Sequence, residues 1–358
     1  MPSLKEIKGR INSISSTLAI TSAMKMVAAA KLQKAQMAIQ NMLPYERRLH
    51  SMLIDLMGAM NISAAASEDG SVRGSGSAER GFDQSGDRLS LSNRHDLAGM
   101  DGAYSLMAQR EVRKVAIVAF ASNSSLCGAF NSNVIREATA VINEYRASGL
   151  GDADITVYSV GRKMAEAMKK LGFPSPADFT KMSDSPSYDA ASALAQELLD
   201  GFVSGRFDKV ELVYNHYKST SSQPTTRQTY LPLSLADATA DLQAGKIADS
   251  ASESDTNRGA EPVGAPVVRQ GSPTTEDLIV EPSKEALIAT LLPKVIRLRV
   301  FTTLLDSAAA EHAARTVSMQ LATDNGNDLL QELTLEYNKG RQQKITSEIL
   351  DLVGGSMQ

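Results

Sequence analysis

The sequence predicts two long helices, one at each end of the chain, that pack together as a rod and carry a small α/β domain between them. Three observations support this fold class. Apolar residues recur at alternating spacings of three and four over residues 4–60, and a second long helical pattern covers 284–353. Between them, short apolar strands alternate with helical stretches over about a hundred residues, as in a mostly parallel, Rossmann-like α/β domain.

The N-terminal helix is predicted over residues 1–62. Ser3 and Glu6 have the spacing of a capping box, and Pro44 is expected to bend or break the helix near Leu43. At 1.5 Å per residue such a helix is roughly 85 Å long, so it needs a partner helix rather than a place inside a globule. The expected seam consists of Leu4, Ile7, Ile11, Ile14, Leu18, Thr21, Lys25, Ala28, Leu32, Ala35, Ile39, Met42, Glu46, Leu49, Leu53, Leu56 and Met60.

The middle of the chain divides by composition. Residues 63–108 and 236–276 are rich in Gly, Ser and Asp with little apolar periodicity, and we interpret both as low-complexity insertions. Residues 109–235 form the predicted α/β domain, and 277–283 hold its last strand, Asp277–Glu281. The other expected strands cover 112–120, 155–160, 209–217 and 227–233, and the expected helices cover 129–146, 161–171 and 188–203.

The C-terminal helix is predicted over residues 284–358. Ser283 is a plausible cap, Pro293 is expected to end or kink a first segment, and Gly354 with Gly355 should stop the helix. From Ser307 to Ala314 five of the eight residues are Ala, which allows two helix backbones to approach closely.

Composition excludes several classes of protein. A net charge of −4 gives no whole-chain argument for nucleic-acid binding, and the single cysteine, Cys127, rules out an intramolecular disulfide and favours a reducing compartment. No apolar run reaches the roughly 18 residues of a membrane span, and no leader pattern precedes the first helix. We therefore expect neither a membrane helix nor a nucleic-acid partner.

Catalytic and cofactor motifs are missing. The sequence has no phosphate-binding loop, no paired metal-binding cysteines and no nucleophile elbow. His312 lacks a second histidine one turn away, so a helix-seam contact is a better interpretation than a metal ligand, and Cys127 is better explained as a buried thiol than as a nucleophile. The turn 122–128 has the position of an anion site but too few glycines for a dinucleotide fingerprint. We expect no enzymatic activity, no cofactor and no small-molecule substrate.

The first helix is locally basic although the chain is acidic. Glu6 is the only acid before residue 35, and Lys25 lies on the predicted seam between Met24 and Met26. A charge at a seam position either extends outward or meets an acid of a partner. The alternative is an ordinary solvated helix face. The basic residues are Lys5, Lys8, Arg10, Lys25, Lys31 and Lys34.

Particular stretches resemble the gamma subunit of F-type ATP synthases. Residues 20–31 (ITSAMKMVAAAK) resemble that family's N-terminal helix, and residues 304–355 resemble its C-terminal helix nearly throughout. In the domain, Leu126 to Asn131 (LCGAFN) follows the family's order. One departure is the turn Ser122-Asn123-Ser124-Ser125, where the family usually has an acid and a glycine, which puts the local contacts of that turn in doubt.

The resemblance implies both an architecture and a function. The terminal helices would form an antiparallel, asymmetric coiled coil inside a ring of three alpha and three beta subunits, and the α/β domain would rest on the membrane c-ring together with the epsilon subunit. The subunit holds no nucleotide. Its rotation would couple proton or sodium flow to ATP synthesis, at the cytoplasmic face of the bacterial inner membrane, as a peripheral subunit.

The resemblance also implies partner contacts. Met24, Lys25 and Met26, with Arg341 and Gln342, would meet mobile acidic loops of the catalytic subunits, and Lys31 would strengthen that attraction. Ile345 and Ile349 belong to an apolar terminal segment that can slide against an apolar collar. Two other hypotheses stay open: a non-rotary coiled-coil adaptor that bridges soluble partners, and an enzyme built on the α/β domain.

Overall fold

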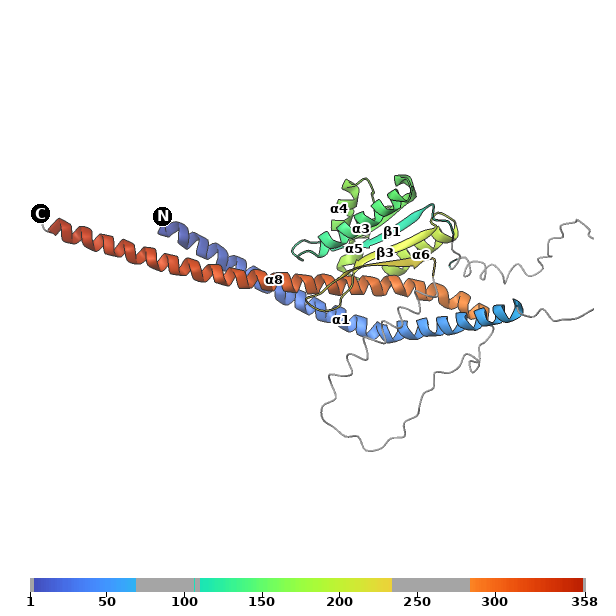
Figure 1. The fold of residues 1–358 in the computed structure, drawn as a ribbon. Coiled ribbons are helices and arrows are strands. Elements are labelled where there is room, and N and C mark those ends of the chain that lie inside the picture. The colour runs from blue at the N-terminus through green and yellow to red at the C-terminus, as the bar shows by residue number, and fades with distance from the viewer. Residues whose placement is uncertain (1–2, 69–105, 107–109, 234–283, 357–358) are drawn as a thin grey trace, which may run out of the picture.

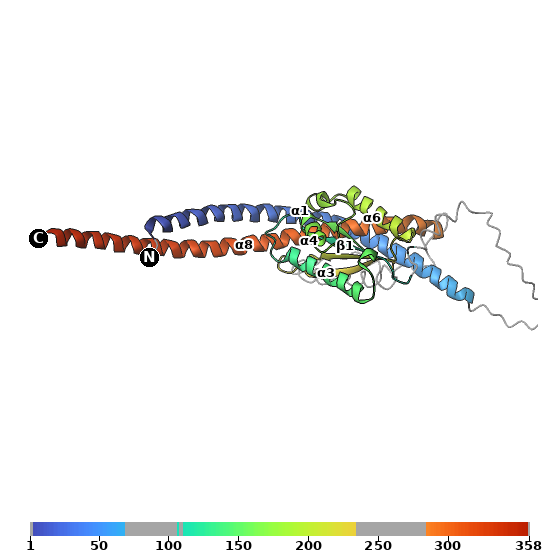
Figure 2. The same ribbon diagram turned by 90° about the horizontal axis from the view of Figure 1, so that it is seen from above.

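The computed structural model describes residues 3–68, 106, 110–233 and 284–356. Helices α1 (Leu4–Glu68) and α8 (Lys284–Ser356) lie side by side as a rod, and an α/β domain packs against one flank of it (Figure 1). Seen from above, the C-terminal end of α8 extends well past the N-terminal end of α1 (Figure 2). The predicted fold class, two long helices with an α/β domain between them, is confirmed.

Helix α1 follows the predicted seam. Every seam position whose side chain is described is buried or half-buried, with Ile7, Ala28, Leu32, Leu49 and Leu53 among the most buried. The Ser3 hydroxyl accepts a hydrogen bond from the Glu6 backbone N–H at 3.3 Å, as a cap should. The helix runs to Glu68, six residues beyond the predicted end at 62.

Both prolines lie inside continuous helices. Of the two outcomes expected at each proline, the break at Pro44 and the helix end at Pro293 do not occur, and Figure 1 shows α1 bent rather than straight. A proline removes one backbone hydrogen bond, and the packed residues around it offset that loss. Leu49 follows Pro44, and Leu292 and Val295 flank Pro293, all buried in the core. Helix α8 also continues through Gly354 and Gly355 to Ser356.

The domain contains a four-stranded mixed sheet in the order β2-β1-β3-β4. Strands β1 (Val115–Phe120), β2 (Ile155–Val160) and β3 (Lys209–Asn215) are parallel, and β4 (Thr225–Leu231) is antiparallel to β3. These are the four strands predicted between 112 and 233, with ends displaced by a few residues. The strand predicted at 277–281 lies outside the described residues.

Three helices form where they were predicted, α3 (Phe130–Ala147), α4 (Arg162–Lys170) and α6 (Tyr188–Val203). Two short elements were not predicted, the 3-10 turn η1 (Asp152–Asp154) and helix α5 (Thr180–Asp184). Neither is long enough to show a helical period in the sequence.

The sheet is covered on both faces. Alternate residues of β1 point to opposite sides, Val115, Ile117 and Ala119 to one and Ala116, Val118 and Phe120 to the other. The first face packs against α3 and α4. The second packs against α6 and against the rod itself, and its partners include Leu49, Leu53, Leu198, Phe202, Ile288, Leu292, Val295 and Ile296. The domain and the rod therefore share one hydrophobic core.

Candidate functional site

The two long helices run antiparallel in a fixed register. An added Cβ at Gly340 would lie 3.1 Å from Leu4 Cδ2, and one at Gly326 would lie 2.6 Å from Leu18 Cδ2. Thr323 Oγ1 donates to Thr21 Oγ1 at 3.1 Å. From one facing pair to the next, the residue number rises along α1 by as much as it falls along α8, as in an antiparallel helix pair. The glycines leave room for the leucines of the partner helix.

The alanine stretch of α8 allows the close approach that its composition predicted. Leu32 of α1 packs against Ala309 and Ala313, which are both fully buried. On the domain side, Ala310 packs against Cys127 and Phe130. A small residue on each side of α8 lets one helix contact both α1 and the domain at the same level.

The last part of α8 extends past the start of α1 (Figure 2). Gly340 lies opposite Leu4 at the start of α1, so residues 341–356 project beyond it by roughly 24 Å at 1.5 Å per residue. All described side chains of 341–350 are exposed. Apolar side chains on this segment, which we call the tip, are Ile345, Ile349, Leu350, Leu352 and Val353, between 47% and 74% exposed.

The predicted contact residues fall into two groups. Met24 and Lys25 are half-buried at the seam, whereas Met26 is 64% exposed and Lys31 is exposed. Arg341, Gln342, Ile345 and Ile349 are exposed on the tip. Since about twenty residues of helix separate the two groups, they lie roughly 30 Å apart along the rod. The structure therefore does not bring them together.

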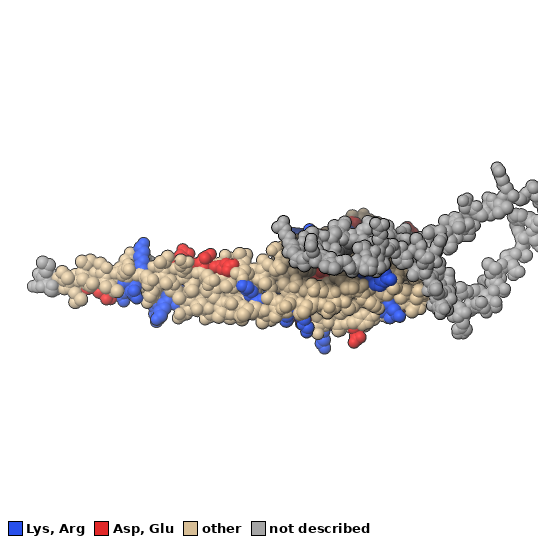
Figure 3. Space-filling model, turned by 90° about the horizontal axis from the view of Figure 1, so that it is seen from below, with Lys and Arg blue, Asp and Glu red and all other residues tan. Residues whose placement is uncertain are grey.

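Charged side chains are scattered over the face of the rod that Figure 3 shows. In Figure 3 neither basic nor acidic side chains dominate it, and they lie in small separate groups. Apolar side chains are exposed along its length on α8, including Val317 at 41%, Leu321 at 60% and Leu335 at 65%. Such a surface suits contact with another protein more than contact with a polyanion.

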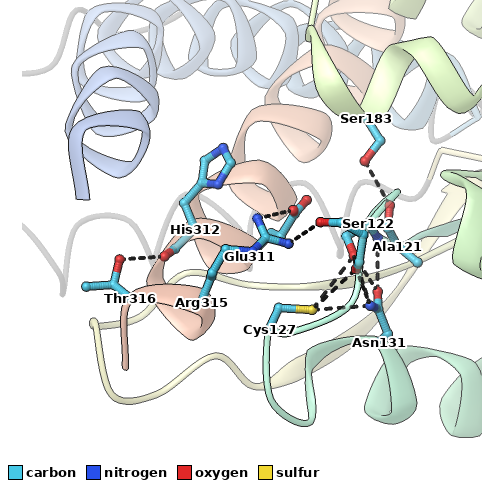
Figure 4. Close-up of polar contacts among 10 residues, drawn as sticks. Ala121, Ser122, Cys127, Asn131, Ser183, Glu311, His312, Arg315 and Thr316 are labelled. Carbon is cyan, nitrogen blue, oxygen red and sulfur yellow. Dashed lines mark hydrogen bonds and ion pairs between the residues drawn. The ribbon is translucent and has the colours of Figure 1, made fainter. Parts of the chain in front are cut away.

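A polar joint fastens the turn after β1 to α8 (Figure 4). Arg315 donates to Ser124 Oγ at 2.6 Å and forms an ion pair with Glu311 at 2.7 Å. Both charged side chains are nearly buried, 12% and 10% exposed. Burial raises the pKa of the Glu311 carboxyl, and the neighbouring Arg315 and Lys31 oppose that rise.

The turn that departs from the family pattern makes its own set of contacts. Asn123 Oδ1 accepts from the Arg162 backbone N–H at 2.7 Å at the start of α4, and Asn123 Nδ2 donates to the Thr180 carbonyl at 2.6 Å. An aspartate accepts but does not donate, so asparagine joins two segments here. Serine at 124 supplies the acceptor for Arg315.

Cys127 is buried at 1% exposure, as predicted, in a cluster of short polar side chains (Figure 4). Asn131 Nδ2 donates to its Sγ at 3.2 Å, and Asn131 Oδ1 accepts from the Ser122 hydroxyl at 3.0 Å. Gly128 has φ +58°, and a Cβ there would lie 2.7 Å from Ser318 Oγ on α8. Glycine is therefore required for this turn to approach the rod.

His312 is a partly buried residue of α8 whose ring lies near the charges of Arg315 and Lys31. Its Nδ1 is buried and makes no hydrogen bond within the described residues. Burial, together with the charges of Arg315 and Lys31, lowers the pKa of His312 to about 4, so the ring is neutral near pH 7. Within the part of the chain that the structure describes, no three His, Cys, Asp or Glu side chains gather as metal ligands would.

A second joint connects the turn after β3 to both long helices. Asp306 of α8 accepts from the Tyr217 backbone N–H at 2.9 Å and lies 2.6 Å from His216 Nδ1. Gln36 of α1 donates to the Tyr217 hydroxyl at 2.7 Å. The contact with Asp306 raises the pKa of His216. The domain is thus held to the rod at the carboxyl ends of β1 and β3.

These joints cover the place where open α/β sheets usually bind ligands. That place is the crevice beyond the carboxyl ends of the strands where the strand order reverses, next to β1 in this sheet. Here Leu304, Ser307, Ala308 and Glu311 of α8 lie against Phe120 and Ala121 at the end of β1, leaving only a small cavity. Residues of α8 therefore occupy the position at which other open α/β sheets bind a ligand.

Sequence reasoning did not find the joint residues Ser124, Asp306, Glu311, Arg315 and Tyr217. Single polar residues in an alanine-rich helix and in turns carry no periodic signal, and only the tertiary contacts pair them. The one signal available was the pair of acids, Asp306 and Glu311, in an otherwise apolar stretch of the C-terminal helix.

None of the described helices has the length and apolarity of a membrane span.

Comparison with known proteins gives consistent results. A family model described as ATP synthase matches residues 3–357. The chain is similar to the ATP synthase gamma chain of Phocaeicola vulgatus, at 47% identity, and to that of Bacteroides thetaiotaomicron, at 45%, over the whole of both chains in each case. A chain of the Euglena gracilis mitochondrial ATP synthase shares the fold, with a TM-score of 0.52 at 18% identity over 99% of this chain and 93% of its own. The chain therefore belongs to the ATP synthase gamma chain family, the non-catalytic rotor subunits that form the central stalk.

Proposed function

We propose that the rod turns inside a ring of three alpha and three beta subunits and drives conformational change at their catalytic sites, powered by transmembrane ion flow. The observation that carries this proposal is the uncovered apolar tip. Ile345, Ile349 and Leu352 are exposed on a helix end that lies beyond the start of α1 (Figure 2). Apolar side chains of this kind are stabilised by burial in a partner. A contact without fixed hydrogen bonds also allows sliding.

The two groups of predicted contact residues act at two levels of the ring in this proposal. Met24, Lys25, Met26 and Lys31 meet acidic loops of the catalytic subunits, and Arg341 and Gln342 contact the ring closer to the tip. The exposure of Met26, Lys31 and Arg341 supports this role. Their separation of roughly 30 Å implies that the two contacts involve different parts of the partner.

We place the c-ring and the epsilon subunit at the other end of the rod. The α/β domain lies away from the tip (Figure 1), where it leaves the tip half of the rod free. The Euglena chain of similar fold comes from an assembly whose description names the F1 part and the c-ring. The chain is then a peripheral subunit at the cytoplasmic face of the bacterial inner membrane.

Deletion of the tip tests the proposal. We expect an ATP synthase whose chain lacks residues 345–358 to lose assembly or coupling, measured as ion pumping per ATP hydrolysed in inverted membrane vesicles. Deletion of residues 66–100 is the control and should have the smaller effect. The reverse order of effects would contradict the proposal. A non-rotary adaptor, in contrast, would bind its partners without any change in the pumping ratio.

A charge reversal tests the contact proposed for Met24, Lys25, Met26 and Lys31. Lys25→Glu should lower the pumping ratio because it places an acid against acidic loops. Lys169→Glu, on the exposed side of α4, is the matched control and should leave the ratio unchanged. If the two variants couple equally well in the same vesicles, Lys25 has no role in this contact.

A further inference from the structure

The turn after β3 makes hydrogen bonds to both long helices. We call the second joint described above the Asp306 clip. It is made of Gln36, His216, Tyr217 and Asp306. Asp306 uses both carboxylate oxygens, one for the Tyr217 backbone N–H at 2.9 Å and one for His216 Nδ1 at 2.6 Å. Gln36 Nε2 completes the clip at 2.7 Å from the Tyr217 hydroxyl. A change in the turn therefore acts on α1 and α8 together.

Hydrogen bonds within the turn and at its base hold the turn in one conformation. The His216 backbone N–H donates to the Pro224 carbonyl at 2.9 Å, and Gln223 Nε2 donates to the Ser219 and Thr220 carbonyls at 3.0 and 2.6 Å. At its base, the buried Asn215 side chain donates to the Phe130 carbonyl at 3.0 Å at the start of α3. Through Asn215, at the end of β3, the clip is therefore hydrogen-bonded to the start of α3 next to the centre of the sheet.

The chemistry of the clip depends on one proton. Neutral His216 can donate from Nδ1 to the ionised Asp306 carboxylate, a bond that is already charge-assisted, and a proton on the ring turns the contact into an ion pair. The imidazole is 51% exposed and so exchanges protons with solvent, whereas Asp306 is 19% exposed. Two charged groups act on the ring, Asp306 of α8, which favours the proton, and Lys218 of the same turn, which opposes it. From α1 the clip receives the uncharged amide of Gln36.

We propose that the Asp306 clip carries torsional load between the α/β domain and the rod, and that a proton on His216 stiffens it. Asp306 and His216 are positioning residues in this role, since neither touches a reacting group. The proposal rests on the proposed rotary function. It predicts that coupling is tighter on the acid side of neutrality and weakens as the pH rises and His216 loses its proton.

The experiment uses the complete ATP synthase in inverted vesicles, with the pH varied on the side of the catalytic subunits from about 6 to 8.5. The readout is ion pumping per ATP hydrolysed, together with the rate of ATP hydrolysis. His216→Lys keeps a cation at every pH, and His216→Gln keeps a neutral side chain at every pH. We expect His216→Lys to lose the decline in pumping ratio that the unsubstituted enzyme shows with rising pH, and His216→Gln to remain at the lower, alkaline ratio throughout.

Asp306→Asn removes the acceptor charge and should behave as His216→Gln does. If this buried variant fails to assemble, the two exposed His216 variants still decide the matter. Identical pH profiles for His216→Lys, His216→Gln and the unsubstituted enzyme would overturn the clip proposal. The tip deletion in the same vesicles separates the two proposals. If it uncouples the enzyme while the His216 variants do not differ, only the clip fails, and if it has no effect, the rotary function itself fails.

Discussion

At the scale of single residues, two polar joints add direction to the shared hydrophobic core that holds the domain against the rod. Arg315 with Glu311 and Ser124 forms one fastening, and Asp306 with His216 and Tyr217 forms the other. A nearly buried ion pair contributes little compared with an apolar pair of the same volume, but its directional bonds set one arrangement. These side chains fix where the domain lies on α8, while apolar burial supplies most of the stability.

Removing Arg315 should be costly. Arg315→Ala leaves the Glu311 carboxylate, in a residue only 7% exposed, without its cation, and we expect a loss of roughly 3–5 kcal/mol in unfolding free energy. Thermal or urea unfolding of the purified chain measures it. Adding Glu311→Leu should recover part of the loss, because no buried charge then remains. Arg113→Ala, which removes an exposed pair with Glu111, is the control and should leave stability unchanged. Equal effects of both substitutions would contradict this account.

His312 should make the chain less stable in acid. Its folded-state pKa of about 4 lies below the ordinary 6.5, so the unfolded chain binds the proton more tightly. The stabilisation is complete above about pH 6.5 and is lost as the pH falls toward 4, by up to about 3 kcal/mol. Thermal unfolding followed between pH 4 and 7 should show a shallower decline for His312→Gln than for the unsubstituted chain. His216, with its raised pKa, contributes in the opposite sense, since its share is lost as the pH rises. Parallel curves for the two chains would refute the assignment.

At the scale of elements, the long helices are shaped by their partners more than by local rules. The seam of α1 was predictable because a repeat of three and four fixes which face is buried. Each proline was expected either to interrupt its helix or to bend it, and neither Pro44 nor Pro293 interrupts its helix, because each lies in a stretch packed against the shared core. The strands 155–160 and the helix 188–203 were predicted to the residue, since each is a strong periodic segment with clear flanking residues. The contacts of Asp306 and Arg315 had no such pattern.

The glycines of the rod provide a test at this scale. Gly9 has nothing within 4 Å of an added Cβ, whereas at Gly326 the new atom would lie 2.6 Å from Leu18 Cδ2. Gly9→Ala should stabilise the chain by up to about 1 kcal/mol through helix propensity alone. Gly326→Ala has the same propensity gain, but Leu18 must move, so its melting temperature should fall below that of Gly9→Ala. Equal stabilisation by the two substitutions would show that the helices do not meet closely at Gly326.

At the scale of the whole molecule, the α/β domain resembles a ligand-binding fold whose crevice is filled by the chain's own helix. Leu304, Ser307 and Glu311 occupy the space beyond the end of β1. This arrangement explains why a fold common among nucleotide-binding enzymes serves here as part of a mechanical subunit. It also argues against the hypothesis of an enzyme built on this domain, because a ligand at that position would have to displace α8.

We therefore expect the chain purified alone to neither hydrolyse ATP nor bind it saturably. Colourimetric phosphate release and titration calorimetry measure the two properties. The control is the same preparation before removal of any contaminating catalytic subunits, which should show activity in proportion to the contaminant. Turnover that survives that removal would contradict the non-catalytic role of the domain.

The overhang of α8 has a consequence for the life of the chain before assembly. Until a ring encloses it, the end of the helix presents Ile349, Leu350 and Leu352 to water, and identical chains meeting at these ends bury the same surface against one another. Surplus copies should therefore self-associate and become substrates for chaperones and proteases. A cell that makes this subunit consequently has to match its synthesis to that of the subunits that receive it.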